Sequence, residues 1–137
     1  MITLCQRERQ NIYSHTHAVD ILPTILQIAR KSTPSWDEGR LLPGLGGVGD
    51  NNRSIFVVEA KSNPVFSPLK KATITIQKDD YKLIYYTGYG LENSFELYNI
   101  RDDMEELNNL YPQSPTIAKT LRDELLDSLS DADQPYK

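Results

Sequence analysis

Two histidines, spaced two residues apart, are the first candidates for chemistry in this chain. His15 and His17 are the only histidines, and on a strand residues two apart share a face from which both could bind a metal ion. A third ligand would have to be a carboxylate, and no acidic residue is marked for that role. The alternative is that both are polar residues preceding a helix. The sequence therefore assigns no metal ligand.

A second candidate is the glycine-rich stretch Gly44–Gly49, which superficially resembles a loop that cradles phosphate. A nucleotide-binding loop needs a strand before it and a helix after it. Here Asp and Asn residues follow, and then a predicted strand. We interpret the stretch as a flexible linker.

A third group of candidate residues is cationic. Lys61, Lys70 and Lys71, together with Asn63, flank a long loop between two predicted strands. Cations in such a place suit an anionic ligand, so these four residues form a candidate substrate rim. The alternative is a solvated loop. No residue is assigned a catalytic role.

Composition excludes several classes of protein. The 137 residues suffice for one domain with its own core, and the net charge of -4 gives no basic balance for nucleic acid or an anionic membrane. The longest apolar runs are too short to span a membrane. Cys5 is the only cysteine, which excludes a disulfide framework and a cysteine-rich zinc site and leaves the redox compartment open.

The N-terminal third predicts one helix and a loop. Apolar residues at helical spacing cover most of the circumference of Ala18–Arg30. Pro23 is tolerated only near the first turn, so the helix should begin close to Asp20. A short strand is expected at Asn11–Ser14. Residues 31–54, rich in Gly and Pro, should lack regular structure.

The rest of the chain predicts a sheet and a second helix. Runs of β-branched and aromatic residues predict four strands, at Ser54–Glu59, Ala72–Gln77, Tyr81–Thr87 and Phe95–Asn99. The short polar connections after the second and third runs predict an antiparallel meander. A short helix is expected from Met104, with Asp102 and Asp103 as caps and with Leu107 and Leu110 packed on the core.

The C-terminal helix is the clearest element. Ser114 is the expected N-cap and Pro115 the first helical residue, and apolar residues recur every four positions, at Ile117, Leu121, Leu125 and Leu129. One apolar face and one charged face are typical of a helix that covers a sheet. The predicted fold class is therefore α+β: a four-stranded antiparallel sheet packed by a C-terminal helix, preceded by an apolar helix and a Gly/Pro-rich linker.

Five segments, in the correct order, resemble the C-terminal end of sulfatases, which are hydrolases of the alkaline-phosphatase superfamily. The matching segments are Asp20 with Pro23-Thr24, Glu38–Pro43, Arg53–Glu59, Asp80–Tyr85, and Glu96–Asn99 with Glu105–Leu110. Each segment alone is a weak signal, and together they cover nearly the whole chain.

The resemblance implies a division into three parts. Residues 1–31 would be the remnant of the end of the large sulfatase α/β domain, residues 32–53 a linker loop, and residues 54–137 the C-terminal subdomain. The catalytic residues of the family lie upstream of these segments, so the chain resembles a fragment. The resemblance implies that the full-length parent protein hydrolyses a sulfate ester, with formylglycine as nucleophile and a divalent metal, usually calcium. It also implies that this chain alone is inactive and holds no cofactor.

Cys5 does not complete the family's formylglycine motif. That motif reads C-x-P-x-R or C-x-A-x-R, and Cys5 and Arg9 have the required spacing. Arg7, however, stands where Pro or Ala is needed, and the family's motif lies far upstream of the segment that contains Asp20. We interpret Cys5 as an ordinary thiol.

Two alternatives stay open for function. The parent could be another member of the superfamily, a phosphodiesterase or a phosphoethanolamine transferase, or the chain could be an independent small interaction module. The partners implied are the missing catalytic domain and, for the parent, a sulfate-ester substrate whose anionic group suits Lys61, Asn63, Lys70 and Lys71. Without that domain the apolar helix lacks a partner, so we expect a homodimer through it.

Overall fold

The computed structural model describes residues 11–50, 52–60, 69–90 and 92–134. Cys5, Lys61 and Asn63 therefore lie outside the described residues. The chain divides into two compact units, Met1–Asn51 and Asn52–Lys137.

The first unit is built on one short helix. A 3-10 turn, η1 (Ala18–Asp20), leads into α1 (Ile21–Ile28), so the predicted start near Asp20 is confirmed. The helix ends where Arg30 adopts a φ of 55° and the backbone N–H of Lys31 donates to the carbonyl of Leu26 at 2.8 Å. This is the hydrogen bond that closes a Schellman motif.

The expected strand at Asn11–Ser14 is wrong. These residues have no ladder partner among the described residues, and a strand requires one. The loop prediction for residues 31–54 is confirmed for its described part, where the one paired position is an isolated bridge between Pro43 and Gly47.

The second unit is an antiparallel meander. Its strands are β1 (Ile55–Ala60), β2 (Ala72–Lys78), β3 (Tyr81–Thr87) and β4 (Ser94–Asn99), and they lie in the order β1-β2-β3-β4. Each predicted strand is found, with ends that differ by one residue at most. Asp79 makes the tight turn between β2 and β3 with a φ of 51°, in the left-handed region that Asp tolerates.

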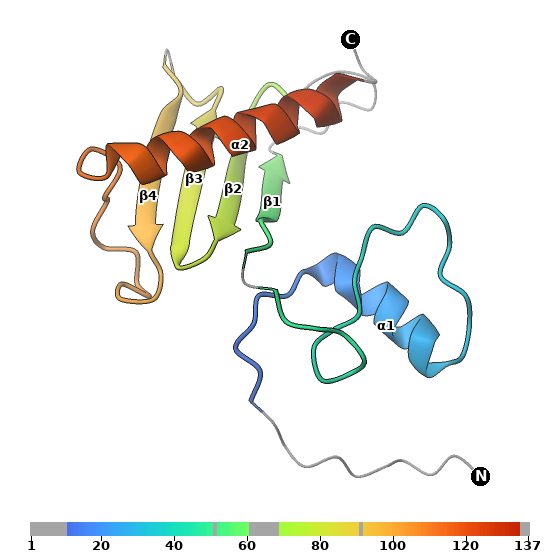
Figure 1. Ribbon diagram of the computed structural model, residues 1–137. Helices are drawn as coiled ribbons and strands as arrows, with labels where there is room; N and C mark the ends of the chain where they lie inside the picture. The colour runs from blue at the N-terminus through green and yellow to red at the C-terminus, as the bar shows by residue number, and fades with distance from the viewer. Residues whose placement is uncertain (1–10, 51, 61–68, 91, 135–137) are drawn as a thin grey trace. The chain divides into compact units, whose positions relative to one another are not determined.

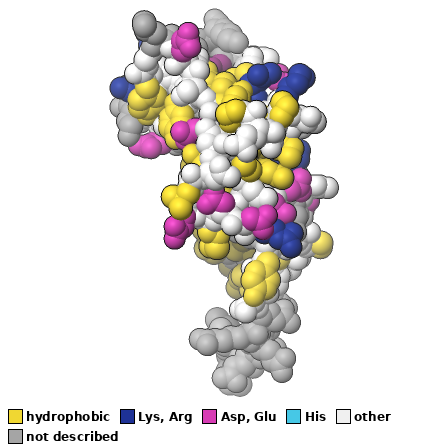
Figure 2. All heavy atoms as spheres, turned by 90° about the vertical axis from the view of Figure 1, so that its left-hand side faces the viewer, with side chains coloured by type: hydrophobic (Ala, Val, Ile, Leu, Met, Phe, Trp, Pro, Cys, Tyr) yellow, Lys and Arg dark blue, Asp and Glu magenta, His cyan; other side chains and the backbone are white. Residues whose placement is uncertain are grey.

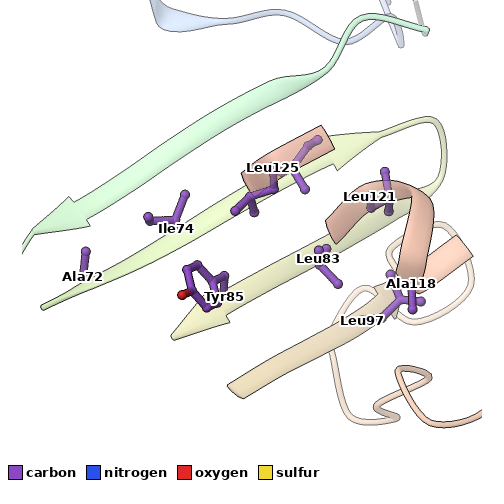
Figure 3. Packing of buried hydrophobic residues seen from close by; sticks show 9 residues of the cluster. Ala72, Ile74, Leu83, Tyr85, Leu97, Ala118, Leu121 and Leu125 are labelled. Atoms are coloured by element: carbon purple, nitrogen blue, oxygen red, sulfur yellow. The ribbon is translucent and has the colours of Figure 1, made fainter. Parts of the chain in front are cut away.

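Helix α2 (Pro115–Asp133) crosses one face of the sheet (Figure 1). Its first residue is proline, after the N-cap Ser114, as predicted. The inner face of the sheet and the helix together form the core (Figure 3), whose buried members are Ala72, Ile74, Ile76, Leu83, Tyr85, Leu97, Ala118, Leu121 and Leu125. The predicted α+β fold class is confirmed.

The segment between β4 and α2 departs from the prediction. The described residues 100–113 form turns instead of a helix from Met104. The carboxylate of Asp103 accepts from the backbone N–H groups of Leu107 and Asn108, and Glu106 takes a φ of 56°. Leu110 packs on the core as expected, but Leu107 is 79% exposed, so its predicted anchoring role is wrong.

None of the helices in the described part of the chain combines the length and the apolar character needed to cross a bilayer. On the face seen in Figure 2, acidic and basic side chains lie mixed among apolar ones, without a continuous field of one sign. This distribution fits the modest net charge of -4.

Candidate functional site

The first unit contains a polar clamp, formed by Asp20 and Thr24. Both side chains are buried, each with 2% exposure. One carboxylate oxygen of Asp20 accepts from the backbone N–H of His17 at 2.9 Å, and the other accepts from the backbone N–H of Arg40, also at 2.9 Å. The hydroxyl of Thr24 donates to the carbonyl of Asp20 and accepts from the backbone N–H of Leu42 at 2.8 Å. The clamp therefore fastens residues 40–42 to α1.

Gly39 lets the loop approach closely enough for these bonds. A Cβ at position 39 would lie 2.2 Å from the carbonyl oxygen of Val19 and 2.9 Å from the ring of Pro23. Any larger residue would push the loop away from the helix. The segment that sequence reasoning interpreted as linker is thus pinned to α1 at Arg40 and Leu42.

The donor set of the described residues does not fit the metal that the family implies. Both carboxylate oxygens of Asp20 are engaged by backbone N–H groups. Elsewhere in the described ranges, no three His, Cys, Asp or Glu side chains lie close enough together to hold an ion. The clamp is therefore a structural device.

His17 is a helix cap, which decides between the two readings of the histidine pair for this residue. Its Nδ1 accepts from the backbone N–H of Val19 at 3.2 Å, and its own backbone N–H donates to Asp20, which completes a capping box. His15 and His17 do not lie on a strand, so the shared face that a chelate needs is not formed.

In the second unit, Lys71 of the candidate rim belongs to an organised cluster. Its Nζ lies 4.8 Å from the centroid of the Tyr89 ring, within the range of a cation–π contact. The hydroxyl groups of Tyr89 and Thr73 are 3.1 Å apart, and the Tyr86 ring meets Tyr89 edge to face at 6.3 Å. We name these four residues, Lys71, Thr73, Tyr86 and Tyr89, the lysine–tyrosine cluster.

Gly88 shapes this cluster. It adopts a φ of 74°, and a Cβ there would lie 1.9 Å from the carbonyl oxygen of Lys70. The turn after β3 can therefore lie against the start of β2, which brings Tyr89 over Lys71. The side chain of Lys70 is exposed beside it. Lys61 and Asn63 lie outside the described residues, so their place in the candidate rim stays a prediction.

The hydroxyl group of Tyr86, a member of the cluster, and that of Tyr98 are both held as donors. Tyr86 and Tyr98 both donate to one carboxylate oxygen of Glu96, at 2.9 and 3.2 Å. Burial, together with the hydrogen bond to Glu96 and its charge, raises the pKa of Tyr86 to about 12. Burial and the Glu96 charge also raise the pKa of Tyr98. The raised pKa keeps each phenol protonated to a higher pH than an ordinary tyrosine.

Sequence reasoning missed Thr73, Tyr86 and Tyr89. One available signal was the sequence Gly88-Tyr89-Gly90 after a predicted strand, since glycine is the default residue where the chain needs a positive φ or a close backbone approach. Another was the alternation along β2 and β3, where Thr73 pairs with Tyr86.

A family model identifies the class of protein, the C-terminal domain of sulfatases. The chain spans about a quarter of the solved sulfatase chains that share its fold. The family model for N-sulphoglucosamine sulphohydrolase, C-terminal, matches residues 5–133, and the chain belongs to this family.

Three solved structures illustrate the shared fold. A candidate sulfatase from Bacteroides fragilis, yidJ, has a TM-score of 0.64 at 20% identity, with 86% of this chain and 26% of that chain covered. BT4656, solved with its substrate D-glucosamine-2-N,6-O-disulfate, has a TM-score of 0.53 at 22% identity, with 85% and 24% covered. A candidate sulfatase from Bacteroides thetaiotaomicron has a TM-score of 0.57 at 25% identity, with 85% and 25% covered.

A relative in Haemophilus influenzae, an uncharacterized protein, is 28% identical over 129 residues. The match covers 92% of this chain but 60% of the relative. Nearly the same stretch of this chain fills 60% of the relative but only 26% of the solved chain from Bacteroides fragilis. The relative is therefore less than half as long as that solved chain.

Proposed function

We propose that this chain serves as the C-terminal part of a sulfatase, with a structural role and a share in the substrate rim. The observation that carries the proposal is the family match over residues 5–133. The parent would hydrolyse a sulfate ester, and the catalytic domain upstream would supply the formylglycine nucleophile and the divalent metal, calcium. Residues 1–31 would form the end of that catalytic domain. Residues 32–53 would link it to the C-terminal subdomain, which residues 54–137 would form.

The clamp supports this role. In the parent, the helix that contains Asp20 and Thr24 would belong to the catalytic domain, while Arg40 and Leu42 lie on the way to the sheet. Hydrogen bonds to the buried side chains of Asp20 and Thr24 fix the path of the chain at this junction, because breaking them would leave these buried polar side chains unsatisfied. The clamp thus sets the direction in which the chain leaves the catalytic domain.

We expect no sulfatase or phosphatase turnover from the chain alone. Its described residues offer no donor set for a metal, and Arg7 stands where the formylglycine motif around Cys5 needs Pro or Ala. The assay is hydrolysis of a chromogenic aryl sulfate and an aryl phosphate with calcium, magnesium or manganese added. Metal-dependent turnover that scales with protein through purification would overturn the proposal. If a sulfatase catalytic part is encoded upstream, co-expression with it should instead give an active complex.

The substrate rim is the second part of the proposal. Lys61, Asn63, Lys70 and Lys71 would face the anionic sulfate ester of the parent's substrate, since cations around a loop raise the local concentration of anions. Lys70 and Lys71 are exposed, as this role requires.

A homodimer through α1 is the third part. Five aliphatic side chains on and beside this helix are about 40 to 64% exposed, namely Val19, Ile21, Leu22, Ile25 and Ile28. In the parent, the catalytic domain would cover them. Without it, a contiguous apolar patch favours association with a second copy.

We expect the mass of the chain to rise with concentration. A single short helix offers only a few hundred Å² of apolar surface, below the roughly 800 Å² per partner of a standard interface, so the dimer should be weak. Light scattering across a concentration series measures it. Ile25→Glu should give a monomer, and Gln27→Glu, a charge on the same helix at an exposed polar position, should not. A monomer at high concentration for the unmutated chain would contradict the dimer.

One observation favours a second function, that of an independent interaction module. The Haemophilus influenzae relative is far shorter than the solved chain from Bacteroides fragilis. The DNA upstream of the gene distinguishes the two. A sulfatase catalytic part in the same frame or operon supports the first function, and its absence supports the module.

A further inference from the structure

The lysine–tyrosine cluster lies at the end of the sheet where β2 begins and β3 ends. Ala72 pairs with Thr87, and Thr73 pairs with Tyr86, so Thr73 and Tyr86 lie directly opposite each other on the two strands. Because Ala60 pairs with Ala72, β1 also ends at this end of the sheet.

The charge of Lys71 is held in place without being neutralised. Lys78, Lys82 and Lys119 each form an ion pair with a carboxylate, at 2.8, 2.7 and 2.9 Å. Lys71 instead lies over the ring of Tyr89, and it has no carboxylate partner among the described residues. A ring holds an ammonium group in position but leaves its full charge and its N–H donors for an anion.

The ring that holds Lys71 is itself fixed. Tyr89 is anchored by its hydroxyl contact with Thr73, by the edge-to-face contact with Tyr86, and by the turn that Gly88 makes possible. A lysine side chain normally loses considerable rotamer entropy when it binds a ligand. Holding it beforehand lowers that cost, which is how a preorganised site gains affinity.

Two acidic groups lie on the strands beside β2 and β3: Glu59 on β1, which pairs with Thr73, and Glu96 on β4. Glu96 accepts from the hydroxyl groups of both Tyr86 and Tyr98. Lys70, adjacent in sequence, adds a second exposed cation. Tyr89 remains 44% exposed, so part of its apolar ring stays available beside the ammonium group.

We propose that Lys71 and Tyr89 form a seat for a sulfate group of a sulfated sugar, with the ammonium group binding the anion and the tyrosine ring flanking the sugar. The ligand class rests on the proposed function. The same ammonium group would also attract inorganic sulfate, so the sugar and the free ion are compared directly.

The test is a titration of the isotopically labelled chain followed by amide chemical shifts. The probes are D-glucosamine-2-N,6-O-disulfate, unsulfated glucosamine and sodium sulfate. We expect saturable shifts centred on Lys71, Thr73 and Tyr89 with the disulfated sugar. Glucosamine should give none, and sodium sulfate should bind at least several-fold more weakly.

Three variants and a matched control assign the effect. Lys71→Gln should weaken binding of the disulfated sugar about five- to tenfold, the range of one charge-assisted contact. Tyr89→Ala should weaken it similarly, and Tyr89→Phe, which keeps the ring, should retain most of the affinity. Lys119→Gln removes an exposed lysine from α2 and should change nothing.

Several outcomes would overturn the seat. They are shifts spread evenly over the lysines, equal effects of Lys71→Gln and Lys119→Gln, unaltered binding in Tyr89→Ala with an intact spectrum, or equal affinity for sodium sulfate and the sugar. These failures leave the proposed sulfatase role standing, because that role is tested separately by turnover and by the upstream catalytic part.

Discussion

Replacing Leu121 with alanine should lower the free energy of unfolding of the second unit by about 2–5 kcal/mol, as truncation of a buried leucine does. Leu121 is 4% exposed and lies between α2 and the inner face of the sheet (Figure 3). The sheet's inner face has α2 as its cover, so a cavity there weakens the docking of the whole helix.

Urea denaturation followed by circular dichroism measures this effect, and Leu126→Ala is the matched control. Leu126 lies on the same helix but is 37% exposed, so its truncation should cost well under half as much. An unchanged urea midpoint for Leu121→Ala, or equal losses for the two variants, would show that α2 does not depend on this contact.

The sheet and α2 could be predicted because their signals are local. β-branched and aromatic runs mark β1 to β4, short polar turns set the antiparallel order, and the four-residue spacing from Ile117 to Leu129 gives the covered face of α2. Each of these signals is repeated over several residues, so no single exception could displace an element.

The segment from Ile100 to Gln113 was predicted less well because one side chain decides it. Asp103 does bind backbone N–H groups, as a cap would, but the groups belong to Leu107 and Asn108, four and five residues on. That spacing closes a wider turn than a helical cap. Glu106 then takes a positive φ, which ends any helix.

The candidate site was predicted only in part, because its contacts join distant residues. Asp20 and Thr24 were recognised as parts of a family segment, but their partners lie 20 and 18 residues away, in what composition alone marks as a linker. Likewise, charge singled out Lys71, while the ring that positions it comes from the turn after β3. Spacing along one element cannot reveal a contact between two.

Substitution of Asp20 in the clamp should cause the second large loss of stability. Asp20→Ala should release residues 39–42 from α1 and destabilise the first unit by about 1–3 kcal/mol. The substitution leaves two part-buried backbone N–H groups, those of His17 and Arg40, without their acceptor, and because water can partly reach them, the cost per group is below that of a fully buried one. A unit with so few buried residues has little stability in reserve, so loss of order is the expected result.

Amide hydrogen exchange separates the two halves of the clamp. Asp20→Ala should expose the Arg40 amide to exchange, whereas Thr24→Val, which keeps the shape but removes the hydroxyl, should first expose the Leu42 amide. Asp50→Ala is the matched control, because Asp50 pairs with Arg40 at the exposed surface and such pairs contribute about 0–1 kcal/mol. Protection of the Arg40 amide that persists in Asp20→Ala, or that falls equally in Asp50→Ala, would mean that the loop is held by something other than the buried carboxylate.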